Sequence, residues 1–238
     1  MSIYRLLNRI AAFYSSHGLV PTIRRVKLAA KRALFANRMV VFYCDLTKQV
    51  SPLDELPNSL KVERVITYAQ LNLEDLQNLT SFWNPKQAHR NIRERFEQGA
   101  SLWLIRSVDK LAGYGWSLQG RTIAPYFLQL GENDVQLFDF YTFPKFRGRA
   151  THWFLTSHIL QTLAAEGRAR AFGDTAEWNK AQLSSFKMTP FRRLGLARCF
   201  TVLGHTLVFW CANEPSEQIR KDRERRNEAP TTARLYGQ

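Results

Sequence analysis

The strongest constraint on the fold is the stretch Phe-Pro-Lys-Phe-Arg-Gly-Arg-Ala at residues 143–150, which joins a β-prone run directly to a helical one. The first backbone N–H groups of a helix have no partner within the helix, and the positive end of the helix dipole lies beside them. A glycine lets the backbone approach a ligand closely, and the flanking arginines can add charge-assisted hydrogen bonds to an anion. The stretch therefore predicts a phosphate-binding loop; the alternative is a basic turn without a ligand.

Hydrophobic periodicity places this junction inside a mixed α/β chain. Runs of alternating or continuous apolar residues, broken by Gly, Pro and Asn, predict the strands, and three or four of them form a meander just before the junction. The expected strands are 39–46, 61–70, 101–107, 110–118, 122–130, 134–143 and 169–175, with a final hairpin around Gly204 and His205; the expected helices are 72–82, 85–98, 151–166 and 179–188.

The length of 238 residues suits one domain with extensions. We expect an α/β domain at 38–211, a basic helical arm at 1–37 and a charged tail at 212–238 that is poor in apolar residues. No apolar run approaches the roughly 20 residues of a membrane-spanning helix. The three cysteines show no metal-ligand spacing, so we expect reduced thiols, no metal and a cytoplasmic location.

The net charge of +14 is concentrated at the start of the chain, because residues 1–40 contain eight Lys or Arg and no acid. Apolar residues at helical spacing predict two helices there, separated near Gly18 and Pro21. One interpretation is that these helices pack on the domain with a solvated basic face. The other is peripheral association with an anionic membrane, at its inner face, or with another polyanion. No nucleic-acid reading module is found, so a nucleic-acid partner is not expected.

The junction and the residues after it resemble the GNAT superfamily of acyl-CoA-dependent N-acyltransferases. The coenzyme A loop of that family commonly reads V-x-P-x-(Y/F)-R-G-x-(G/A), and residues 142–150 match it except for Thr142 in place of Val. Asn179 follows the next predicted strand, as in the family, and residues 191–196 fit its Y-x-x-x-G-F pattern with Phe191 in place of Tyr. The resemblance covers about residues 60–211 and implies a mainly antiparallel central sheet flanked by helices.

The resemblance also implies acetyl-CoA or another acyl-CoA as donor substrate. Backbone N–H groups of residues 147–151 would hold the pyrophosphate, Phe143 would lie beside the pantetheine, and Asn179 would meet the thioester region. The donor-binding residues implied in this way are Thr142, Phe143, Arg147, Gly148, Arg149, Ala150, Thr151 and Asn179.

Acyl transfer to an amine needs a proton acceptor, an oxyanion donor and an acid for the leaving thiolate. Family members often use a strand carboxylate as base, and Asp139 is the best match, although it could equally be a structural acid. By strand alternation it should share a face with Val135, Leu137 and Tyr141. Glu177 and Asp174 are the next candidates, because their strand end should open toward the same cleft.

The general acid is less clear, because Phe191 cannot donate a proton. Tyr141, Ser184 or Ser185 could replace it, or the thiolate could leave unassisted.

The expected function is therefore an acyltransferase that uses direct attack in a ternary complex. The resemblance suggests an amine acceptor, free or carrier-linked, such as an amino sugar in envelope polysaccharide synthesis. An acidic acyl carrier protein as donor also fits the charge. Two alternatives remain open at this point: a catalytically idle coenzyme-binding or scaffold protein, and a membrane-surface or polyanion-binding module that acts through residues 1–37.

Overall fold

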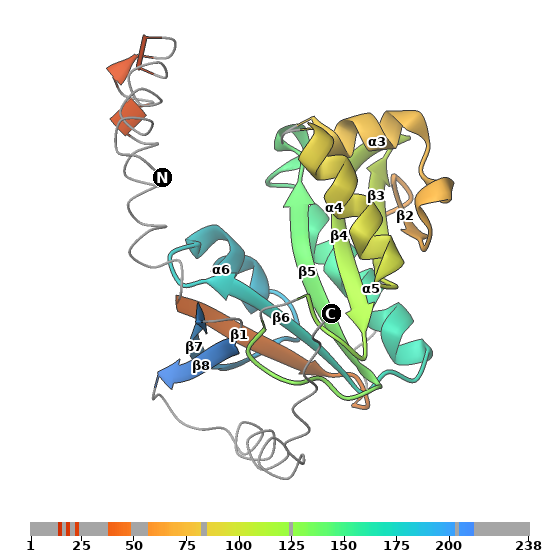
Figure 1. Ribbon diagram of the computed structural model, residues 1–238. Helices are drawn as coiled ribbons and strands as arrows, with labels where there is room; N and C mark the ends of the chain where they lie inside the picture. The colour runs from red at the N-terminus through yellow and green to blue at the C-terminus, as the bar shows by residue number, and fades with distance from the viewer. Residues whose placement is uncertain are drawn as a thin grey trace, which may run out of the picture.

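One eight-stranded sheet organises the chain in the computed structural model, which describes residues 14–15, 18–19, 22–23, 38–48, 57–81, 85–123, 126–202 and 205–211 (Figure 1). Its strand order is β2-β3-β4-β5-β6-β1-β7-β8. Every neighbouring pair is antiparallel except β5 and β6, which are parallel. The predicted fold class, a mixed and mainly antiparallel sheet flanked by helices, is confirmed.

The elements follow the predicted order closely. The strands are β1 (Arg38–Asp45), β2 (Leu60–Val65), β3 (Ser101–Ser107), β4 (Lys110–Gln119), β5 (Asp134–Thr142), β6 (Arg170–Ala176), β7 (Arg192–Val202) and β8 (His205–Cys211). The helices are α3 (Leu73–Thr80), α4 (Pro85–Glu97), α5 (Thr151–Ala165) and α6 (Lys180–Lys187), with 3-10 turns η1 (Tyr68–Gln70) and η2 (Pro144–Phe146).

Two predicted strands need correction. The strand expected at 61–70 ends at Val65, because the Gln70 side chain accepts hydrogen bonds from the N–H groups of Ile66 and Thr67 and closes a turn. The strand expected at 122–130 is wrong: its described residues form a loop, and its apolar side chains are buried against a face of the sheet instead of continuing it. The helices predicted in the arm lie largely outside the described residues, as does the tail.

Helices cover both faces of the sheet (Figure 1). Leu155, Ile159 and Leu160 of α5 pack on one face, where Leu183 and Phe186 of α6 also lie. The opposite face is covered by α3 and α4 over β3 and β4, and by the loop at 126–130 over β6, β1 and β7. The sheet is therefore fully buried between two layers near its centre, where β5 and β6 meet.

A β-bulge interrupts β5 next to this centre. Asp139 has a φ of 49°, and the pairing of β4 with β5 shifts register between Tyr114 and Trp116. Gly115 lies opposite the bulge, where a Cβ atom would come within 2.5 Å of the Phe140 ring. The extra residue reverses the alternation. The prediction that Tyr141 shares a face with Val135 and Leu137 is therefore wrong, and Tyr141 packs on the α4 side.

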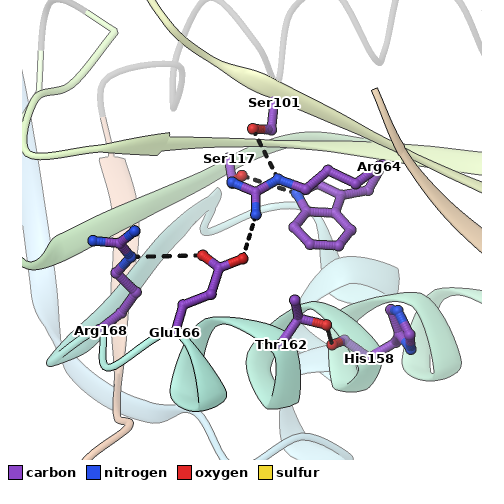
Figure 2. A network of polar contacts seen from close by, with 8 residues as sticks. Arg64, Ser101, Ser117, His158, Thr162, Glu166 and Arg168 are labelled. Carbon is purple, nitrogen blue, oxygen red and sulfur yellow. Dashed lines mark hydrogen bonds and ion pairs between the residues drawn. The ribbon is translucent and has the colours of Figure 1, made fainter. Parts of the chain in front are cut away.

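A polar network fixes the far end of α5 (Figure 2). Arg64 of the edge strand β2 donates from Nε to the Ser101 hydroxyl at 3.1 Å and forms an ion pair with Glu166, just past α5, at 2.5 Å. Its guanidinium stacks over the Trp103 ring, whose Nε1 donates to Ser117 at 2.9 Å. These contacts connect β2 to the C-terminal end of α5. Because a helix is rigid, they also help to fix the position of its N-terminal end.

The N-terminal strand β1 lies in the interior of the sheet, between β6 and β7, and those two strands do not pair with each other. Arg38, at the start of β1, accepts a hydrogen bond from the Glu177 backbone and pairs with the Glu177 side chain at 2.8 Å. The arm at 1–37 is therefore attached beside the end of β6.

Candidate functional site

The centre of the site is a gap between two neighbouring strands. The β5–β6 pairing extends only over Asp134–Gln136 and Arg170–Phe172, although both strands continue for several residues. Beyond those pairs a cavity of about 230 Å³ lies between them, lined by Leu137 on one side and Gly173 on the other. Strands that separate in this way leave edge groups that an amide-containing ligand can pair with.

The loop at 143–150, for which the sequence predicts an anion cradle, ends at the beginning of α5. Gly148 and Ala150 have left-handed backbone, with φ of 76° and 55°. The N-cap residue Ala150 offers no side-chain cap. Among the residues that the structure describes, no acceptor contacts the backbone N–H groups from 148 to 153. These donors, next to two arginines, can bind an anion strongly.

One detail of the predicted cradle is corrected by the hydrogen bonds. The N–H of Arg147 donates to the Pro144 carbonyl at 3.3 Å, so the available run starts at Gly148. The Arg147 side chain is positioned by its own contacts, because Nε donates to the Thr142 carbonyl at 3.1 Å and the guanidinium lies 5.6 Å from the Tyr141 ring centre.

Most of the predicted donor-binding residues surround one open cavity of about 660 Å³ at this loop. Phe143 is an exception: its ring is buried against Tyr114 and Tyr141, so it supports the loop from beneath and does not line the cavity. Arg149 is exposed on the loop and is not part of the wall. The predicted residues in the wall are Thr142, Arg147, Gly148, Ala150, Thr151 and Asn179.

The cradle cavity continues into the gap between the strands, because both are lined by Phe140, His152 and Gln182 as well as Asn179. Asn179 is the N-cap of α6, and its side-chain oxygen accepts from the Gln182 N–H at 3.3 Å. A long ligand held at the loop would therefore reach the point where β5 and β6 separate.

Asp139 lies where this gap meets a third cavity, of about 270 Å³, under α4. Its carboxylate forms an ion pair with Arg95 at 2.5 Å, and the Arg95 guanidinium lies over the Trp116 ring at 5.1 Å. The rest of the wall combines an aromatic surface from β4 with amide side chains spaced one turn apart on α4: Tyr114, Gln87 and Asn91. Asp139 is therefore a carboxylate that is already paired with a cation, at the boundary of two cavities.

Glu177 does not face the gap, contrary to prediction. It pairs with Arg38 and lines a separate groove between α6 and β1, together with Ser184. Tyr141 and Ser185, two of the side chains expected as candidate acids, line the cradle cavity. Asp174, the other carboxylate named with Glu177, does line the gap.

Two residues of the site were missed from the sequence. Arg95 sits on an amphipathic helix whose charged residues resemble a solvated face, so nothing in the pattern singled it out. The other is His152, which lies in the gap against Phe140, and burial lowers its pKa to about 4. A histidine in the first turn after the loop was the available signal.

The described residues contain no group of three or more His, Cys, Asp or Glu that could hold a metal ion. Cys44 is a free, buried thiol, and burial raises its pKa to about 11. No helix in the described ranges is long and apolar enough to cross a membrane.

No family model and no curated protein matches the sequence. Among solved structures, a tandem GNAT protein from the clavulanic acid biosynthesis pathway has a TM-score of 0.50 at 14% identity, over 77% of this chain and 57% of its own. A GNAT-family acetyltransferase from Colwellia psychrerythraea has a TM-score of 0.49 at 12% identity, over 66% and 52%. An IAA acetyltransferase from Bacillus cereus has a TM-score of 0.41 at 15% identity, over 60% and 79%. The chain spans little more than half of the first two proteins, and the likeness to the tandem GNAT protein shows that it has the GNAT fold.

Proposed function

Starting from the GNAT fold, we propose that this protein is an acyltransferase that moves an acetyl or other acyl group from coenzyme A to an amine. The observation that carries the proposal is the combination of a basic loop with free backbone donors and a gap between strands that begins beside it. A pyrophosphate fits the loop, and a pantetheine arm fits the gap, because each requires the donors found there.

Binding in this orientation places the thioester between β5 and β6, near Leu137 and Gly173. The amine would come from the α4 side, through the cavity bounded by Trp116 and Asp139. That cavity has an aromatic wall and several amide and charged groups, a surface that suits a polar acceptor with an apolar face, such as an amino sugar. Both substrates can then be present together, which allows direct attack.

The donor half of this proposal is tested by thermal shift with acetyl-CoA, coenzyme A and 3′,5′-ADP. A ligand that binds only the native state raises Tm by mass action. At a free ligand concentration of about 100 times Kd, binding adds about 2.7 kcal/mol to the free energy of unfolding. We expect both coenzymes to raise Tm, and 3′,5′-ADP to do so less because it lacks the pantetheine. No shift at millimolar coenzyme would refute the donor site.

We assign Asp139 and Arg95 to binding of the amine acceptor. Because Arg95 already engages the Asp139 carboxylate, the pair can hold the amine substrate by its polar groups. Asp139→Asn and Arg95→Ala should each raise the acceptor KM about 10-fold, the effect of losing one charge-assisted contact, with kcat within about threefold.

Steady-state kinetics at saturating acetyl-CoA measures the acceptor KM and kcat separately. Glu94→Gln is the matched control, because Glu94 lies on the same helix in an exposed i,i+4 pair with Arg90. A fall in kcat without a rise in KM in Asp139→Asn would instead make Asp139 the proton acceptor.

The proposal has three further parts: an acidic acyl carrier protein as donor, a role in envelope polysaccharide synthesis, and peripheral membrane contact through residues 1–37. The charge of the arm supports the first and the last of these. Deleting residues 1–37 should leave coenzyme binding within twofold and remove binding to anionic liposomes.

A further inference from the structure

Asp174 occupies a position in the gap that the chemistry described so far does not use. It lies on β6, on the other side of the gap from Asp139, and both line the same cavity of about 230 Å³. By strand alternation its side chain belongs with Phe172, on the face covered by the loop at 126–130. Asp174 therefore faces the side from which the amine arrives.

Unlike Asp139, Asp174 is not engaged by a cation. Among the described residues its side chain makes no ion pair and no hydrogen bond. The hydroxyl of Tyr126, from the covering loop, is buried close enough to interact electrostatically with Asp174, and it also lacks a hydrogen-bond partner within the described chain. Asp174 is half-buried in the cavity wall, and an unpaired carboxylate in a cleft is a candidate for contact with a substrate.

The surroundings of Asp174 are almost free of other charge. The other titratable groups in the cavity wall are Asp139 from β5 and His152 from α5, while β1 and α6 contribute only uncharged side chains to it. Tyr126, from the covering loop, interacts with Asp174 electrostatically but does not line the cavity. Burial raises the pKa of Asp174 to about 6, and burial together with the Asp174 charge raises that of Tyr126. An acid in this setting is ionised at neutral pH and still basic enough to take a proton.

We infer that Asp174 is the proton acceptor of the proposed acyl transfer, with the Tyr126 hydroxyl as a neighbour that interacts with it electrostatically. The inference rests on the proposed function. The neutral amine attacks the thioester carbonyl, the C–N bond forms, and the Asp174 carboxylate takes the proton that the nitrogen must lose. The C–S bond then breaks with its electron pair on sulfur. The proton on Asp174 passes to the thiolate, so the products are the amide and coenzyme A thiol.

The test measures release of free thiol from acetyl-CoA with a panel of primary amines, between pH 5 and 9, for the wild type, Asp174→Asn and Tyr126→Phe. Loss of a general base costs about 100-fold or more in kcat. We expect that loss in Asp174→Asn, with acetyl-CoA affinity by calorimetry within twofold. In the wild type the rate should fall as pH drops through about 6, because the carboxylate becomes protonated, and this inflection should be missing in Asp174→Asn. Asp109→Asn, in the exposed β3–β4 turn, is the matched control.

The possible outcomes separate this inference from the proposed function. Wild-type transfer with an unchanged rate and inflection in Asp174→Asn overturns the role of Asp174 and leaves the acyltransferase standing. Coenzyme binding without thiol release by the wild type with any amine overturns both. In Tyr126→Phe the inflection should move, because the electrostatic interaction of the hydroxyl with Asp174 is lost while the ring that fills the loop remains.

Discussion

Gly148→Glu should abolish measurable coenzyme A binding, a loss of at least about 100-fold, or about 2.7 kcal/mol. Gly148 is at the centre of the cradle, and a Cβ atom added there meets nothing within 4 Å, so a carboxylate can extend freely into the anion site. There it repels the pyrophosphate and competes for the N–H groups and for Arg147. Isothermal calorimetry with coenzyme A measures the effect.

A matched control exists at the other end of the same helix. Gly167 has a φ of 75° against 76° for Gly148, and its added Cβ also meets nothing within 4 Å. Gly167→Glu thus adds the same charge and the same left-handed strain, about 1–2 kcal/mol, far from the cradle. We expect equal losses of Tm in the two variants and normal binding in Gly167→Glu. Equal coenzyme affinity in both would show that the loop is only a basic turn.

Asp134→Ala should destabilise the fold by about 3–5 kcal/mol, because it removes the buried carboxylate of a two-pronged ion pair with Arg170. Asp134 is 2% exposed and forms a two-pronged pair with Arg170 at 2.8 and 2.6 Å, and it also accepts from the Gly131 N–H. The pair joins β5 to β6 where they are still hydrogen-bonded, so it closes the narrow end of the gap. Urea unfolding measures the stability change.

Asp45→Ala is the control, because it tests whether the loss of any ion pair destabilises the fold by the same amount. Asp45 pairs with Lys48 at 3.2 Å in a solvent-exposed i,i+3 arrangement, so its loss should cost less than about 1 kcal/mol. Asp134→Ala should also weaken coenzyme binding, because the angle between the strands is no longer held. A stability loss below 1 kcal/mol for Asp134→Ala would contradict the role given to this pair.

Local sequence signals were enough for most of the fold. Strands and helices came from periodicity over several residues, and the cradle came from a glycine and two arginines at a strand-to-helix junction, so each depended on neighbours in the chain. The prediction of a strand at 122–130 was wrong because Tyr126, Phe127 and Leu128 cover a face of the sheet and do not pair with a strand. Their apolar character comes from this burial. Composition cannot separate these two cases.

The site was harder to predict because its groups meet through long-range contacts. Asp139 could be selected from its strand, but its partner Arg95 is 44 residues away on a helix. The bulge at Asp139 also reversed the face of Tyr141, since one extra residue changes every later position. The wrong placement of Glu177 has a similar cause: Arg38, far away in sequence, draws it to the other side of α6.

The interior position of β1 has a consequence for how the domain folds. The sheet is divided into β2–β6 and β7–β8, and β1 is the strand that pairs with both parts in the described structure. Its partners follow it by well over a hundred residues, so its insertion has a high contact order and should come late. Until then strands β2–β6 can assemble on their own, with the outer edge of β6 exposed. A peptide with the sequence of β1, supplied separately, could then complete the sheet by strand addition.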